Sequence, residues 1–249
     1  MEQLGNSYLT VQDKDKDKDK DKVKEKDMDI SVTTPVFGCS TPDLIAIARL
    51  AEDSNTHAIL SPEVPPWSGL SNAHLLANNT KETKIGTWIS NIYLRHSVMC
   101  AAEAMTIQEA SGGRMLLGLG VSHAPVNKAL GVDMGDPIER MRTYVNEIRA
   151  HLDGSSEQTR LKRQVESFPI YIAGLTEKTA ELAGEVADGL MPYLTTPSHL
   201  QKLIEAGTNV FLQDSFGRGC IHLAVRANIF FVLENALQQS KKPKDHQPK

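Results

Sequence analysis

The chain has 249 residues, of which 40% are hydrophobic, and a formal net charge of −4 at pH 7. This length and apolar content suffice for one large core, and α/β barrels of this size often form a single domain. Because the charge is slightly negative and no basic face is obvious, the composition does not indicate a nucleic-acid partner.

The cysteine pattern and the hydropathy bear on location. The three cysteines, Cys39, Cys100 and Cys220, are widely spaced and include no C-x-x-C pair. This spacing predicts free thiols in a reducing cytoplasm. No run of about 18 uninterrupted apolar residues occurs, so we expect neither a membrane span nor a secretion signal. The histidines have no ligand-like spacing, and we expect no metal site.

The first 28 residues differ from the rest of the chain. Asp and Lys alternate over residues 13–22, and this bias continues to residue 27. Such a tract has no apolar face to bury, and its charges balance. We therefore expect residues 1–28 to be a disordered leader without chemistry, followed by a folded core over residues 29–200.

Within the core, strand-like and helix-like patterns alternate. Apolar strand-type runs occur at residues 30–37, 58–61, 84–90, 115–121, 169–173 and 189–194. Helical patterns lie between them at residues 42–53, 98–110, 137–152 and 177–187. This alternation predicts an α/β fold with a parallel sheet covered by helices. Right-handed crossovers allow either an open sheet or a closed barrel.

The helix expected at residues 137–152 carries the strongest local signals. Asp136 can cap its first turn, Pro137 suits the first helical position, and Glu139 complements the helix dipole. Apolar residues then repeat at helical spacing and form one stripe: Ile138, Met141, Val145, Ile148 and Leu152. The stripe predicts that one face of this helix packs on the sheet.

A glycine-rich segment at residues 111–123 is the most informative stretch. It predicts a tight turn, a buried strand and a strand end followed by Ser122 and His123. Ligands of parallel α/β proteins bind at such strand ends. Gly118 and Gly120 carry no side chains, so a flat cofactor could lie against the backbone there. The alternative is that these glycines serve close packing.

Several segments, taken together and in order, resemble a known family. These are residues 84–91 (KIGTWISN) with Arg95 and His96, then residues 111–123, 137–142, 171–175 and 183–189. Over about residues 40–200 the chain resembles the luciferase-like monooxygenases, most nearly the branch that uses the deazaflavin coenzyme F-420. The resemblance implies a TIM (β/α)8-type barrel with its cofactor at the carboxyl ends of the strands. It also implies hydride transfer between a reduced deazaflavin or flavin and a small organic substrate, with some members activating oxygen.

The resemblance further implies where the cofactor binds. The family places the cofactor phosphate near the start of the helix after Ala173, which points to Gly174, Leu175 and Thr176. A helix start offers free N–H donors and partial positive charge. The alternative for Thr176 is a role as the cap of this helix, which is compatible with a phosphate site. Gly120, Ser122 and Ala173 are also expected to contact the cofactor. The implied cofactor is F-420, with FMN as the alternative.

At the third strand end, Asn91 is expected to bond the edge of the cofactor ring. Related proteins carry a cis peptide bond that precedes a residue other than proline near this point. By resemblance, this bond is expected within residues 89–91, behind the ring. The alternative for Asn91 is a plain loop residue, and the alternative for Arg95 and His96 is packing or capping of the helix that follows them.

Three residues are candidates for acid–base or substrate contacts. Residues 61–67 (SPEVPPW) resemble the pattern SDHFxPW of some deazaflavin enzymes, in which Trp67 matches the tryptophan. Glu63 stands at the histidine position, and His123 stands where those enzymes carry a glutamate. An imidazole exchanges protons near neutral pH, so His123 is the leading catalytic candidate. For Glu63 we favour a solvated loop carboxylate.

The last segment, residues 201–249, departs from the pattern. Residues 207–224 resemble a single ankyrin unit, whereas residues 221–232 alternatively supply a seventh strand. An eighth strand and helix are not found, so we expect the barrel to be incomplete at this end. The alternative function is therefore a truncated, inactive barrel that acts as a binding or assembly module. A homodimer would cover the two sheet edges that an open barrel exposes.

Overall fold

The computed structural model describes residues 31–34, 39–159, 162–193 and 196–206. These residues form seven strands: β1 (Ser31–Thr33), β2 (Ala58–Ser61), β3 (Lys84–Thr87), β4 (Ser90–Asn91), β5 (Met115–Gly120), β6 (Ile170–Ala173) and β7 (Gly189–Met191). Every pairing is parallel, in the order β1-β2-β3-β5-β6-β7, and β4 also pairs with β5. The predicted parallel sheet is therefore confirmed.

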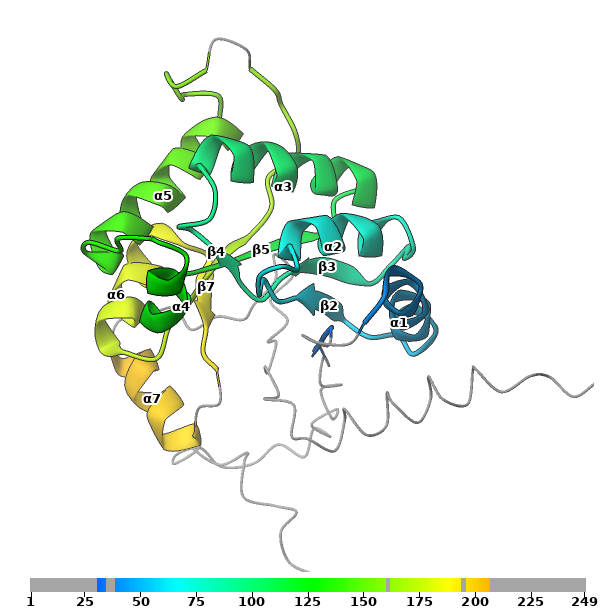
Figure 1. Ribbon diagram of the computed structural model, residues 1–249, viewed down its shortest axis with the longest axis horizontal. Coiled ribbons are helices and arrows are strands. Elements are labelled where there is room, and N and C mark those ends of the chain that lie inside the picture. The colour runs from blue at the N-terminus through cyan, green and yellow to red at the C-terminus, as the bar shows by residue number, and fades with distance from the viewer. Residues whose placement is uncertain (1–30, 35–38, 160–161, 194–195, 207–249) are drawn as a thin grey trace, which may run out of the picture.

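Helices connect the strands and cover one side of the sheet. They are α1 (Thr41–Asp53), α2 (Gly69–Ala77), α3 (Ser97–Ser111), α4 (Ala124–Ala129), α5 (Pro137–Leu152), α6 (Glu177–Val186) and α7 (Pro197–Glu205). Figure 1 shows most of them as an arc around the strands, so the described part of the chain is a curled half-barrel. The expected leader and the ankyrin-like segment lie outside the described residues, and no described helix is long and apolar enough to cross a bilayer.

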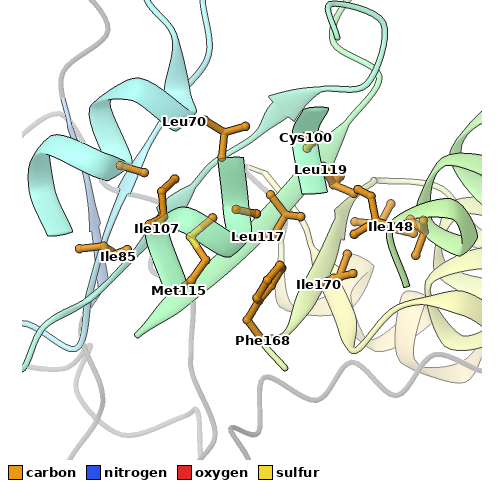
Figure 2. Packing of buried hydrophobic residues seen from close by; sticks show 14 of the residues in the cluster. Leu70, Ile85, Cys100, Ile107, Met115, Leu117, Leu119, Ile148, Phe168 and Ile170 are labelled. Carbon is orange, nitrogen blue, oxygen red and sulfur yellow. The ribbon is translucent and has the colours of Figure 1, made fainter. Parts of the chain in front are cut away.

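Alternate residues of the strands pack into two separate clusters. One set lies in the main core with residues of the helices, as Figure 2 shows for Ile85, Leu117 and Ile107. The other set, from the concave side, includes Leu60 and Met191. Because successive side chains of a strand point to opposite faces, these clusters identify a sheet that is buried on both sides.

Helix ends follow the expected chemistry where the sequence carries it. The Asp136 carboxylate accepts hydrogen bonds from the N–H groups of Ile138 and Glu139, and α5 occupies the predicted range. His96 caps α3 by accepting a hydrogen bond from the Val98 N–H. The sequence patterns did not reveal α2, α4 or α7, of which α4 has only six residues.

The predicted third strand is interrupted. Gly86 of β3 lies opposite Leu116, and Ser90 of β4 lies opposite Leu119, so four residue steps face three on β5. One extra residue in one strand is a β-bulge. The cis peptide bond lies within it, between Trp88 and Ile89. The expected position within residues 89–91 is wrong, because Ser90 and Asn91 already pair regularly with β5 and the irregular backbone comes before them.

Candidate functional site

The predicted site residues gather at one edge of the sheet. All strands run in parallel, so their carboxyl ends lie at the same edge, where α/β proteins place their active sites. Glu63 and Trp67 follow β2, Asn91 ends β4, Gly120 ends β5 before Ser122 and His123, and Ala173 ends β6 before Gly174, Leu175 and Thr176. The fold therefore brings residues from four strand positions to a common edge.

Glu63 is buried rather than solvated, which corrects the sequence interpretation. Its carboxylate accepts hydrogen bonds of 2.8 Å from the Ser90 hydroxyl and 2.8 Å from the Asn91 backbone N–H. It also forms an ion pair of 2.6 Å with Nη2 of Arg95, and the Glu63 side chain is only 3% exposed. A buried carboxylate is tolerated when charge-assisted partners replace water, and here three partners do so.

Arg95 completes this cluster from the segment before α3. Its Nη1 donates to the Ser90 hydroxyl at 2.7 Å, and its Nε lies 3.5 Å from the Glu103 carboxylate. Burial by itself lowers the pKa of Arg95, but the neighbouring Glu63 and Glu103 carboxylates outweigh it and the pKa is raised. Arg95 therefore stays charged and holds Glu63 in place.

Asn91 is also buried, and protein groups engage its carboxamide. Its Nδ2 donates to Oδ1 of Asn127 at 2.8 Å, and its Oδ1 accepts from the Tyr93 N–H at 3.1 Å. Asn127 in turn donates to the Val121 carbonyl at 2.7 Å. These bonds tie the end of β4 to the loop after β5. A contact between Asn91 and a cofactor ring remains a prediction.

The glycines of β5 do not leave bare backbone, contrary to expectation. A Cβ atom on Gly118 would lie 2.2 Å from the Thr87 carbonyl oxygen, and one on Gly120 would lie 2.5 Å from the Ile89 side chain. The β3–β4 bulge presses against β5 at both positions. Gly118 and Gly120 are thus required for close packing of the bulge, the alternative considered from the sequence.

The loop after β5 presents the leading catalytic candidate. Ser122 has a φ of 56°, in the left-handed region that residues other than glycine rarely adopt. His123 follows as the residue before α4, is exposed and forms no capping hydrogen bond. Its imidazole therefore lies on the surface beside the strand ends.

The start of α6 is a capped helix end. The Thr176 hydroxyl accepts from the Thr179 N–H at 3.2 Å, and the Thr179 hydroxyl accepts from the Thr176 N–H at 3.1 Å. The capping role of Thr176 is confirmed. A Cβ on Gly174 would lie 2.3 Å from Oγ1 of Thr179, so this glycine permits the cap. The other first-turn N–H groups have no acceptor within the helix.

Two further side-chain arrangements at this edge were not predicted. His199 of α7 places Nε2 2.8 Å from the Leu175 carbonyl oxygen, beside the start of α6. Trp88 and Tyr193 form an edge-to-face pair with ring centroids 6.4 Å apart, and Tyr193 is 60% exposed. Both arrangements join segments distant in the chain, so local sequence patterns could not reveal them.

Hollows also occur away from the strand ends. One of about 290 Å³ lies between α2 and α3, and one of about 130 Å³ lies between α3, α5 and the segment after α5. Neither is lined by a predicted site residue. Among the described residues, no three His, Cys, Asp or Glu side chains gather as a metal site.

Glu63, Asn91 and Arg95 had sequence signals through the resemblance to the family, whereas Asn127 had none. Asn127 follows a loop and sits in a six-residue helix, where nothing in the local pattern marks it. Its importance comes from its complete burial against Asn91 and Val121, which is a tertiary property.

Comparisons with known proteins agree with the fold. The chain is 30% identical over 146 residues to a 5,10-methylenetetrahydromethanopterin reductase of Methanolobus tindarius, covering 53% of this chain and 45% of the relative. The same enzyme of Archaeoglobus fulgidus is 28% identical over 164 residues, covering 61% and 49%. The chain thus spans about half the length of the curated relatives it matches.

Among solved structures, the coenzyme F-420-dependent tetrahydromethanopterin reductase of Methanopyrus kandleri superimposes with a TM-score of 0.62. The two share 20% sequence identity, and the match covers 72% of this chain and 59% of that one. At this identity the comparison shows a common fold. The family model of the luciferase-like monooxygenases matches residues 28–213. The chain therefore belongs to the luciferase-like monooxygenase family.

Proposed function

We propose that this protein is an oxidoreductase that transfers hydride between a reduced deazaflavin or flavin cofactor and a small organic substrate. The observation that carries the proposal is the gathering of the predicted site residues at the carboxyl edge of a parallel sheet. Membership of the luciferase-like family supports it, as do reductases among the relatives. No described residue favours the alternative of an inactive assembly module.

For the cofactor, we favour F-420 over FMN. A related fold belongs to a reductase that depends on F-420, which supports this choice. Both cofactors carry a phosphate, and the first-turn N–H groups of α6 with residues 174–176 would hold it. His199 lies within reach of the same turn. When bound, the cofactor supplies the redox chemistry, and the protein supplies binding and orientation.

The chain's own residues divide the remaining tasks. The bulge with Ile89 and the end of β4 form a wall at the strand edge, against which a ring would be oriented. His123 is exposed at this edge, and we assign to it the exchange of a proton with the substrate. Trp67 is half-buried after β2 and would contact the substrate. Glu63 is committed to Arg95, so we no longer assign it proton transfer.

A fluorescence titration of the purified full chain tests this function. F-420, FMN and riboflavin are added separately, and riboflavin serves as the control because it lacks the phosphate. We expect micromolar binding of F-420 or FMN, with F-420 the tighter, and much weaker binding of riboflavin. A folded protein that binds neither F-420 nor FMN would contradict the proposal and favour the inactive module.

A further inference from the structure

The end of β4 is held from two opposite directions by buried polar groups. Glu63, after β2, binds the backbone N–H of Asn91, and Asn127, in α4, binds the carboxamide of the same residue. The polar contacts thus run without a break from β2 across β4 to the segment after β5. They join three neighbouring strand ends at the predicted site.

On the β2 side, the contact depends on a negative charge. One Glu63 oxygen accepts from the Ser90 hydroxyl, the Asn91 N–H and Nη1 of Arg95, and the other accepts from Nη2 of Arg95. An amide in place of the carboxylate would turn one N–H₂ group toward the guanidinium or the strand. Glu63→Gln therefore loosens β4 without creating a cavity.

On the β5 side, the contact depends on a carboxamide. Asn127 is 0% exposed, accepts from Asn91 and donates to the Val121 carbonyl. Val121 directly precedes Ser122 and His123, so this one side chain fixes both the end of β4 and the loop that carries the exposed imidazole.

The opposite end of the sheet provides a close parallel that is purely structural. The Gln108 carboxamide accepts from the Met115 N–H at 3.0 Å and donates to the Glu166 carbonyl at 3.2 Å, with 3% of the residue exposed. There too a carboxylate holds backbone N–H groups, since Glu52 accepts from residues 81–83. The amino edge therefore also contains a buried carboxamide and a carboxylate that bind backbone groups. It contains no predicted site residue.

We propose that Glu63 and Asn127 are positioning residues, which hold Asn91 and the His123 loop in the geometry that binds the cofactor. This inference rests on the proposed function. Its specific content is that loss of either side chain weakens cofactor binding beyond what loss of stability explains.

The test compares variants at the two edges. Asn127→Ala is paired with Gln108→Ala, and Glu63→Gln with Glu52→Gln. For each, thermal unfolding, binding of F-420 and FMN, and the visible-region circular dichroism of the bound cofactor are measured. We expect all four to lower the Tm. Only Asn127→Ala and Glu63→Gln should raise the Kd, by about tenfold, and alter the dichroism of the cofactor.

The measured Kd values distinguish failure of the proposed function from failure of this inference. If wild-type protein binds neither cofactor, the proposed function and this inference fall together. If wild type binds but the carboxyl-edge variants match their amino-edge controls in Kd and dichroism, only the inference is overturned. Should Asn127→Ala fail to fold, Asn127→Ser retains a hydroxyl donor and acceptor. It is then expected to raise the Kd to a smaller extent, and a wild-type Kd would overturn the inference.

Discussion

At the scale of single residues, the bonding partners of a charged group determine whether it is buried or solvated. Glu63 lies in a loop rich in proline, which suggests a solvated carboxylate. The structure instead pairs it with Arg95, whose side chain is 16% exposed. The Arg–His match alone could not supply this pairing, because the two residues are 32 positions apart and meet only through the sheet.

Removing Arg95 leaves the Glu63 carboxylate buried without its cation. Arg95→Met should lower the free energy of unfolding by about 3 kcal/mol, in the range for breaking a buried pair. Urea unfolding monitored by circular dichroism measures the change. Arg142→Met, which breaks exposed ion pairs with Glu139 and Glu185, is the control and should leave stability nearly unchanged. Equal losses of stability would show that the buried Glu63–Arg95 pair contributes no more than an exposed ion pair, which would contradict this prediction.

Glu52 makes the free energy of unfolding depend on pH. Burial raises the pKa of Glu52, but hydrogen bonds from the backbone N–H groups of residues 81–83 outweigh it and lower the pKa below 4.5. A group with a lowered pKa in the folded state stabilises the protein above its ordinary pKa, and this stabilisation is lost as the pH falls through the folded value. The stability difference between wild type and Glu52→Gln should therefore shrink on acidification below pH 4.5. Urea unfolding across this pH range measures it, and a constant difference would contradict the assignment.

At the scale of elements, the sequence predicted what local patterns encode. The cap and the apolar stripe of α5 identified its full range, and Ala58–Ser61 was identified as a strand. The break between β3 and β4 was not predicted, since an apolar run gives no sign of an extra residue. Likewise, the glycines of β5 marked an important strand end, but the bulge that explains them comes from another strand.

The bulge contact can be tested by paired substitutions. Gly120→Ala should lower the free energy of unfolding by about 1–3 kcal/mol, because its Cβ overlaps the Ile89 side chain. In an Ile89→Ala background the loss caused by Gly120→Ala should be smaller, because alanine lacks the Cγ1 and Cδ1 atoms that the new Cβ would overlap. Gly118→Ala meets the Thr87 backbone oxygen, so Ile89→Ala should not reduce its cost. Chemical unfolding of each glycine variant with and without Ile89→Ala measures these effects, and a reduced cost at both glycines or at neither would contradict the packing described.

At the scale of the whole molecule, the parallel direction of the strands places the predicted site residues together. Residues between Glu63 and Thr176 meet only because every described strand ends at the same edge. The resemblance to the luciferase-like family located these positions from the sequence, and the family match over residues 28–213 confirms that resemblance. The groups that hold the edge together, among them Asn127 and His199, depend on the fold and became visible only in the structure.

In the proposed function, the carboxyl edge of the half-barrel binds the cofactor. Hydrogen–deuterium exchange of the full chain, with and without saturating F-420 or FMN, tests it most directly. We predict slower exchange on cofactor binding in residues 88–96, 121–127 and 174–178, and unchanged exchange at the amino edge in residues 80–83 and 112–114. Protection confined to the amino edge or to the hollow between α2 and α3 would contradict the claim.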